Sequence, residues 1–228
     1  MKFKSNVYTQ ASGSIGGITY SRNAGGMYTR SRTIPTNPNT ALQQDAKSRL
    51  STLADRWVNV LTDAQRAAWA VYAQQVPLIN TLGETRPIPA NAMYIRCNSP
   101  RLLAGLAAVD AGPTNYTLAT LTPPTVPSIT AATDTVEYEF SNADPWATAV
   151  GGALLVFISR PQNETVNFFK GPFQFAGSTL GAVVPPASPD SQVSNFAIAV
   201  GQRVFARFIA TEADGRLSAD VIRFLTAT

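Results

Sequence analysis

The sequence predicts a multidomain α+β protein with an extended N-terminal arm, a small helical bundle and a C-terminal antiparallel β-sandwich. Three observations predict this class: a Gly-rich basic stretch over residues 1–39, apolar residues at helical spacing over residues 40–112, and alternating strands between Pro-rich turns over residues 113–228. A chain of 228 residues, 45% of them apolar, is long enough to bury a real core. We therefore expect three regions with these boundaries.

The N-terminal stretch shows no apolar periodicity of a folded domain and contains five basic residues and no acidic residue. Residues 16–22 read Gly-Gly, apolar, Thr, Tyr, Ser, Arg, and residues 25–30 repeat Gly-Gly, apolar, Tyr and Arg in the same order. Each copy is typical of a short strand that follows a flexible hinge. We expect an arm that binds a partner through the Tyr and Arg side chains and their neighbours: Tyr20, Arg22, Met27, Tyr28, Arg30 and Arg32.

Two capping boxes mark helix starts in the second region. Thr40 with Gln43, and Thr62 with Gln65, have the spacing at which both side chains satisfy free backbone amides at a helix start. Apolar residues then recur at steps of three and four, which indicates one buried face for each helix. In the first helix this face comprises Leu42, Ala46, Leu50, Leu53, Trp57 and Val60. In the second it comprises Ala68, Trp69, Tyr72 and Val76.

Prolines set the limits of the later helices. Pro77 is expected to end the second helix, and a third helix is expected over residues 91–106 with a kink or break at Pro100. The aromatic residues of the first two helices could form a stacking platform for nucleic-acid bases. Aromatic residues at helical spacing are far more often part of a core, so we expect them to be buried.

Alternation of apolar and polar residues predicts strands over residues 136–140, 173–175 and 204–210. Residues 152–158 are apolar throughout, as expected of a strand at the centre of a sheet. Residues 212–216 form a turn with Gly215 placed for a hairpin. About seven short strands in this region would fit an antiparallel sandwich.

The last of these hairpins carries a resemblance. Residues 203–218 resemble the final hairpin of fibronectin type III or immunoglobulin-like modules. The resemblance implies a module of adhesion or assembly, although that fold hosts many different functions.

The composition leaves few catalytic options. Without His, the chain lacks the commonest general base and zinc ligand, and its one Cys, Cys97, is expected to be a small core residue. We expect no enzyme activity, no metal and no cofactor. The one enzyme class that the composition permits is a glycan hydrolase with two carboxylates. Its candidate residues are Glu84, Glu137, Glu139 and Glu164.

No apolar run approaches the roughly 18 residues of a membrane helix, so no membrane association is expected. A single cysteine cannot form an internal disulfide, which favours assembly in a reducing cytoplasm.

A second resemblance covers roughly the first half of the chain. Residues 16–23, 28–32 and 35–40 resemble the opening of uncharacterised proteins encoded by tailed bacteriophages and prophages. The helical part is similar too, at Leu61, Thr62, Gln65, Trp69, Tyr72, Asn91, Tyr94, Asn98 and residues 102–105. The resemblance implies a structural component of the virion, made in the cytoplasm of the host bacterium.

Two classes of function therefore fit. The first is a non-enzymatic structural protein of a tailed bacteriophage particle, either a head decoration or cement protein or a neck or tail component. It would form homo-oligomers and bind other virion proteins, such as capsid, neck or tail subunits, through its arm.

The alternative is a nucleic-acid-binding protein whose arm neutralises phosphates and stacks on bases. The side chains involved would be Lys2, Lys4, Arg22, Arg30 and Arg32 with Tyr8, Tyr20 and Tyr28. Five positive charges are modest for that task, which makes this the second choice.

Overall fold

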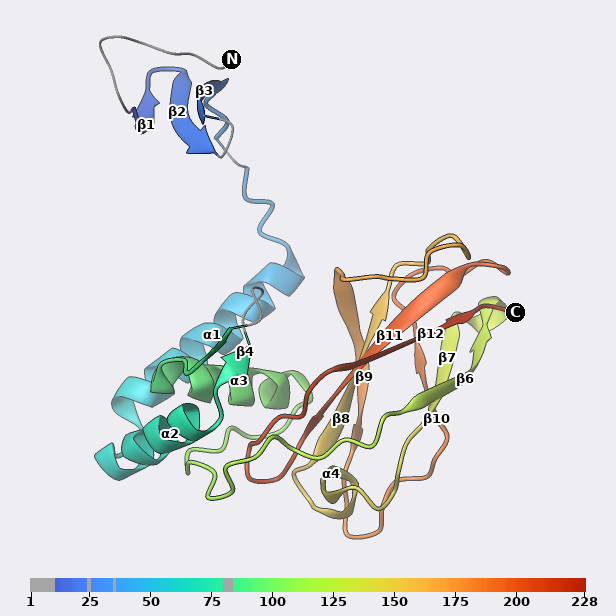
Figure 1. Ribbon diagram of the computed structural model, residues 1–228. Coiled ribbons are helices and arrows are strands. Elements are labelled where there is room, and N and C mark those ends of the chain that lie inside the picture. Colours follow the sequence, from blue (N-terminus) through green and yellow to red (C-terminus); the bar gives the residue numbers. More distant parts are fainter. Residues whose placement is uncertain (1–10, 24–25, 35, 80–83) are drawn as a thin grey trace. The chain divides into compact units, whose positions relative to one another are not determined.

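The computed structural model describes residues 11–23, 26–34, 36–79 and 84–228 (Figure 1). The chain forms two compact units, Met1–Gln44 and Asp45–Thr228. It belongs to the mixed α+β class with antiparallel sheets, as the sequence predicts. Three residues of the nucleic-acid alternative, Lys2, Lys4 and Tyr8, lie outside the described residues.

The first three helices begin within one residue of their predicted starts, and the sequence does not predict the short fourth helix. In chain order they are α1 (Ala41–Asn59), α2 (Asp63–Gln75), α3 (Ala90–Leu103) and the short α4 (Pro145–Thr148). Before α2, the Gln65 amide donates to the Thr62 hydroxyl over 3.3 Å, and the Thr62 amide donates to the Gln65 side chain over 2.8 Å. Thr40 and Gln43 make the same reciprocal pair before α1, at 3.4 and 3.3 Å. Both predicted capping boxes are confirmed.

The helices enclose a small core, here called the helical core. The Trp69 ring meets Tyr72 and Tyr94 edge-on, at centroid distances of 5.8 and 5.5 Å. The aromatic residues of α2 are thus core residues, as predicted. The buried members of the helical core are Leu53, Leu61, Trp69, Tyr72, Ala73, Val76, Met93, Tyr94, Cys97 and Leu217.

Asp110 ties the helices together at the edge of this core. Its carboxylate accepts hydrogen bonds from Arg56 of α1 at 2.5 Å and from the Tyr94 hydroxyl of α3 at 3.0 Å. Its backbone carbonyl accepts from the Trp69 ring nitrogen of α2 at 2.9 Å. Asp110, which follows α3 in the chain, therefore binds one side chain from each of the three helices.

The predicted apolar face of the first helix is only partly buried, so this prediction is wrong for some of its residues. Leu42, Leu50 and Val60 are 62%, 53% and 50% exposed, whereas Leu53 is fully buried. Helical spacing places these residues on one side of α1, but burial also requires an element packed against that side. Within the described residues, none of the α1 residues before Leu53 is buried.

The third helix is continuous through Pro100, so it is not split there, and the alternative of a kink stays a prediction. Pro100 lies inside α3, which runs on to Leu103. The chain then turns at Gly105, whose positive φ of 78° is accessible to glycine without strain.

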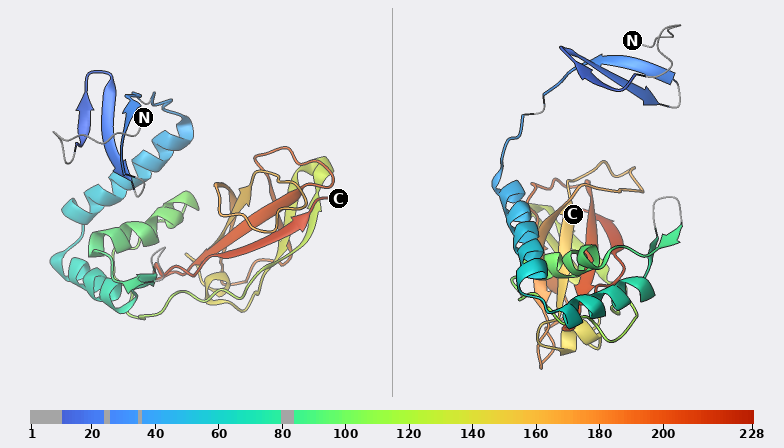
Figure 2. Two further views of the ribbon diagram at one scale, coloured as in Figure 1. Left: turned by 45° about the horizontal axis from the view of Figure 1, so that its top comes forward. Right: turned by 90° about the vertical axis from the view of Figure 1, so that its left-hand side faces the viewer.

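Two antiparallel sheets make up the C-terminal part (Figures 1 and 2). The first has the order β10-β7-β6 and the second the order β12-β11-β8-β9. Their strands are β6 (Thr125–Thr130), β7 (Thr135–Glu139), β8 (Ala153–Ser159), β9 (Phe173–Leu180), β10 (Asp190–Val193), β11 (Arg203–Thr211) and β12 (Val221–Thr226). A 3₁₀ turn (Ala131–Thr133) links β6 to β7, and β4 (Leu78–Ile79) with β5 (Thr85–Arg86) forms a short hairpin before α3.

The two sheets share one hydrophobic core. The first sheet contributes Ile129, Val136 and Tyr138, and the second contributes alternate residues of β8 and β11. The apolar strand β8 lies between β11 and β9, which confirms its predicted central place. The buried members from the second sheet are Leu154, Val156, Ile158, Val204, Ala206, Phe208 and Ala210.

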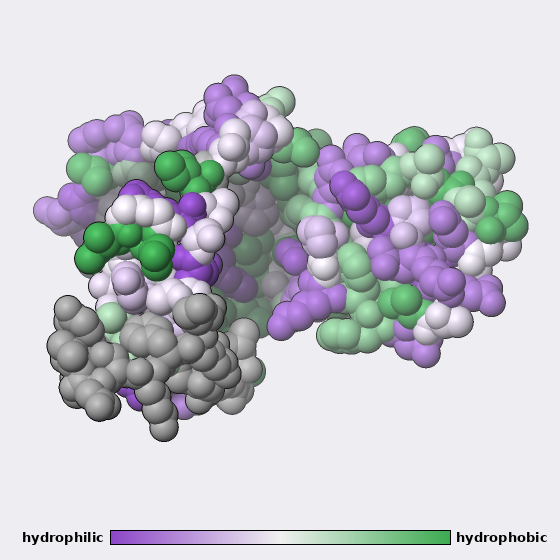
Figure 3. All heavy atoms as spheres, turned by 90° about the horizontal axis from the view of Figure 1, so that it is seen from above, coloured by the Kyte–Doolittle hydropathy of each residue, from purple (hydrophilic) through white to green (hydrophobic). Residues whose placement is uncertain are grey.

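Large apolar side chains also reach the surface of the C-terminal part. Phe168, Val183 and Val184 are 79%, 81% and 81% exposed. Seen from above, hydrophobic and hydrophilic residues are interspersed over the surface (Figure 3). Single exposed apolar residues of this kind are normal in soluble proteins.

The turn between β11 and β12 is built into the helical core. Leu217 is one of the helical-core residues, and a Cβ atom on Gly215 would lie 3.7 Å from the Trp69 ring. Arg101 of α3 donates hydrogen bonds to the carbonyl oxygens of Gly151 at 2.9 Å and Glu212 at 2.7 Å. The helices and the second sheet are therefore joined across the expected domain boundary at residues 112–113. Whether each part folds alone stays a prediction.

We expect Arg101→Met to lower the free energy of unfolding by about 2–4 kcal/mol, because it leaves buried carbonyl groups without a donor. Arg86→Met is the matched control, since Arg86 is exposed on β5 and should change stability by less than about 0.5 kcal/mol. Urea unfolding of both variants measures the difference. Equal stabilities would show that Arg101 does not join the two parts.

Burial raises the pKa of the Cys97 thiol to about 12. The thiolate is the reactive form, so at a pH of about 8 Cys97 should react with a disulfide reagent only when the protein unfolds. We expect the rate at which the Cys97 thiol reacts to rise with the fraction of protein that urea unfolds. A fast reaction of the native protein would mean that Cys97 is accessible.

Candidate interaction site

The residues of the predicted arm fold into a sheet of their own. Strands β1 (Gly13–Ile15), β2 (Ile18–Asn23) and β3 (Gly26–Ser31) pair antiparallel in the order β1-β2-β3. The two predicted strand units correspond to β2 and β3. The expectation of an extended arm is wrong for these residues, because the two alternating units pair with each other. We call this element the N-terminal sheet.

A two-glycine turn sets the register of this sheet. Ile15 pairs with Ile18, so Gly16 and Gly17 alone make the turn, and Gly16 has a positive φ of 59°. The hydroxyl groups of Ser14 and Thr19 hydrogen-bond across β1 and β2 at 2.8 Å. The Arg32 amide donates to the Gly17 carbonyl at 2.8 Å, which extends the pairing of β3 beyond its last residue.

The register separates the six candidate residues into two sets. Arg22 pairs with Met27, so these two side chains share one face with Tyr20. Tyr28 pairs with Ser21 and lies on the opposite face. Alternation along β3 adds Arg30 and Arg32 to the Tyr28 side. We call the two surfaces the Tyr20 face and the Tyr28 face.

The two Tyr and Arg repeats therefore point in opposite directions. A single neighbour in contact with one face cannot make the same contacts with both repeats. The structure brings together Tyr20, Arg22 and Met27, and separately Tyr28, Arg30 and Arg32. It does not bring all six into one site.

The N-terminal sheet has no buried core among its described residues. Within the described residues before Asp45, no residue is buried, and Ile15 and Ile18 are 79% and 45% exposed. Residues 1–44 contain five basic residues and no acidic one, whereas residues 45–228 contain the other 13 basic and all 14 acidic residues. The N-terminal sheet thus combines apolar side chains with basic residues, and residues 1–44 contain no acidic residue to balance their charge.

The acidic candidates for a glycan hydrolase lie in different places. Glu137 and Glu139 share the outer face of β7 and accept hydrogen bonds from Ser128 at 2.6 Å and Thr125 at 3.0 Å. Glu84 directly precedes β5.

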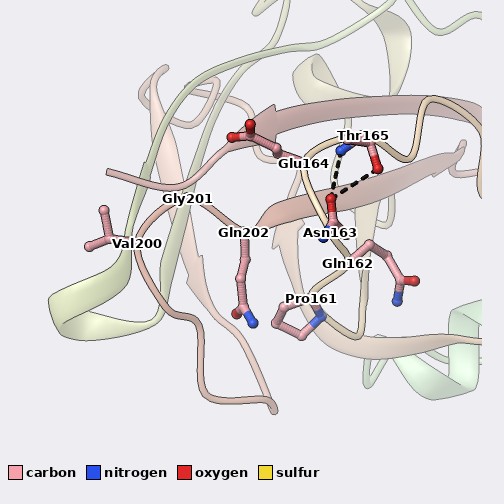
Figure 4. A pocket seen from close by; sticks show the side chains of 8 residues that line it. All are labelled: Pro161, Gln162, Asn163, Glu164, Thr165, Val200, Gly201 and Gln202. Carbon is pink, nitrogen blue, oxygen red and sulfur yellow. Dashed lines mark hydrogen bonds between the residues drawn. The ribbon is translucent and has the colours of Figure 1, made fainter.

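Glu164 lines a cavity of about 540 Å³ between the β8–β9 and β10–β11 connections (Figure 4). In this cavity Asn163 accepts two hydrogen bonds from Thr165, at 3.1 and 2.9 Å. Glu164 is the one acidic residue among those that line it. The arrangement does not bring a second carboxylate to Glu164 there.

Sequence analysis missed a second group of basic side chains, on the outer face of the second sheet. The guanidinium groups of Arg203 and Arg207 lie over aromatic rings, Arg203 over Phe224 at 4.9 Å and Arg207 over Phe157 at 5.2 Å. Alternation in β11 contained the signal, because Phe205 lies between the two arginines on the same face of the strand.

The chain matches no protein-family model, no curated protein and no solved structure. In the described part of the chain, no helix combines the length and apolar character needed to cross a membrane. The same residues contain no group of three or more Cys, Asp or Glu side chains placed to hold a metal ion.

We expect Gly16→Val to weaken the N-terminal sheet, because a β-branched residue is strained at this positive φ. Gly17→Asn is the control, since Gly17 does not have a positive φ and a Cβ atom there would meet nothing within 4 Å. Trypsin cleavage after Arg22 and Arg30, at a protein concentration at which the sheet is protected, measures the loss, because cleavage requires the strands to open. Faster cleavage is expected for Gly16→Val alone, and equal rates in both variants would contradict the two-residue turn.

Proposed function

We propose that this chain is a non-enzymatic structural protein of a tailed bacteriophage particle, either a head decoration or cement protein or a neck or tail component. Its N-terminal sheet would bind neighbouring subunits, either copies of the chain or other virion proteins. The virion assignment rests on the resemblance of residues 16–40 and of the helical part to proteins of tailed phages and prophages.

One structural observation supports the assembly role. The described part of the N-terminal sheet buries no side chain, although it carries Ile15, Ile18 and Met27. A small sheet is stable only if a hydrophobic face packs against something. A neighbouring subunit that covers one face would supply the missing contact.

The strand edges offer a second mode of contact. β3 is an outer strand of the N-terminal sheet, so its outer backbone groups are placed to pair with a strand of a neighbour. Such β-augmentation obtains affinity from main-chain hydrogen bonds and specificity from alternate side chains. Those side chains in β3 are Met27 and Thr29 on one face, and Tyr28 and Arg30 on the other.

We also propose that the two C-terminal sheets form a fibronectin type III-like sandwich. The first, second and fifth of its seven strands form one sheet, and the third, fourth, sixth and seventh form the other. Relative to the constant-type immunoglobulin order, the fourth strand has moved to the second sheet. This is the strand order of fibronectin type III modules, which often act in adhesion or assembly.

Sedimentation of the full chain and of a variant lacking residues 1–32 tests the proposal. We expect the full chain to form oligomers as its concentration rises and the shortened chain to stay monomeric. Oligomers held by packing and backbone pairing should persist at about 0.5 M salt, where exposed charges are screened. Identical oligomers of both chains would contradict the role of the N-terminal sheet, and a monomeric full chain at every concentration would contradict its binding to copies of the chain.

Nucleic-acid binding is the second candidate, and the Tyr28 face favours it. Tyr28, Arg30 and Arg32 share that face, which combines an aromatic ring with exposed positive charge. Fluorescence anisotropy with single-stranded DNA would then show binding that falls steeply with salt. Arg30→Gln should weaken it more than Arg22→Gln, because Arg22 lies on the opposite face.

A further inference from the structure

A cavity of about 280 Å³ lies between α3 and the β11–β12 hairpin. None of its lining residues belongs to the N-terminal sheet, and it plays no part in the proposed function. Two arginines from different elements line it, Arg96 from α3 and Arg207 from β11. The remaining lining residues are Pro100, Ile209, Leu217, Ser218, Ala219 and Asp220.

Arg207 is held in place by aromatic rings. Its guanidinium carbon lies 5.2 Å from the centre of the Phe157 ring and 5.8 Å from that of Phe173. Such contacts orient the planar group and leave its edge for hydrogen bonding. The arginine therefore presents a positioned group to the cavity.

The Nε–H group of Arg207 is shielded from solvent and has no hydrogen-bond acceptor among the described residues. The nearest acid, Asp220, places its carboxylate 3.9 Å from this nitrogen, which is too long for a hydrogen bond. The described residues contain three such groups, on Arg49, Arg203 and Arg207, and an unpaired buried polar group is costly.

The other polar groups nearby are already used. The Ser218 hydroxyl donates to the Ala219 carbonyl at 2.8 Å and accepts from the Ala210 amide at 2.9 Å. With two arginines and one aspartate, the lining carries a net charge of +1. This charge matches a singly charged anion better than a doubly charged one, which Asp220 would repel.

We propose that this cavity binds a carboxylate group. Arg207 donates from its two terminal nitrogens, in the two-point geometry that a carboxylate accepts, and Arg96 adds a second positive charge from the α3 side. The carboxylate belongs either to a small free acid or to an acidic side chain of a partner protein. Both sources offer the same chemical group to the two arginines.

NMR of the arginine Nε–H signals tests the proposal on the full chain. Titration with sodium propionate should shift the Arg207 signal to saturation. Arg96→Gln and Arg207→Gln should each weaken the affinity about tenfold, as expected for the loss of a charge-assisted hydrogen bond. Arg86→Gln is the control, because Arg86 lies outside the cavity, and it should leave the affinity unchanged.

Asp220→Asn provides a test of opposite sign. Because Asp220 competes for Arg207, its neutralisation should raise the affinity for propionate. A purely structural role of Asp220 would lower it or leave it unchanged. Arg96→Gln keeps the proposal testable if Arg207→Gln disturbs the aromatic contacts.

A comparison of ligands identifies the source of the carboxylate. A glutamate-rich peptide that binds more tightly than propionate assigns the site to a partner's side chain, and weaker binding assigns it to a small free acid. The proposal is overturned by the absence of saturable shifts, by equal affinities in the two Arg→Gln variants and the control, or by tighter binding of inorganic phosphate than of propionate.

Discussion

A β-sheet has to bury an apolar face, and this constraint governs both units of the chain. In residues 45–228, two sheets bury their inner faces against each other, and the helices cover part of the second sheet's other side. The N-terminal sheet shows no such burial in its described residues. This difference is the basis of our proposal that the N-terminal sheet contacts a neighbour.

The turn between β11 and β12 makes the larger unit a single body. Leu217 fills a place in the helical core, and Arg101 binds carbonyl groups of the adjoining loops. Burial lowers the pKa of the Arg101 guanidinium, so the cation is retained at a cost that its several acceptors offset.

Local signals in the sequence predicted local structure well. The two capping boxes, the central apolar strand β8 and the Gly215 turn are confirmed because each depends on residues close in sequence. The predictions that failed required knowledge of distant partners. Leu42 and Leu50 have helical spacing, but no element among the described residues packs over them. Strand β2 pairs with β3 and does not form part of an unpaired arm. The hydrogen bonds of Asp110 and Arg101 could not be predicted either, because they join residues that are far apart in the sequence and share no periodic spacing.

Hydrogen exchange of the β2 and β3 amides over a series of protein concentrations tests most directly whether the N-terminal sheet depends on a neighbour. The account predicts that in dilute solution these amides exchange within about tenfold of the unfolded-chain rate, and that protection increases as the chain assembles. The β8 and β11 amides, which lie in the shared core, should stay protected throughout. Strong protection of β2 and β3 at every concentration would show that the sheet is stable alone and would contradict the account.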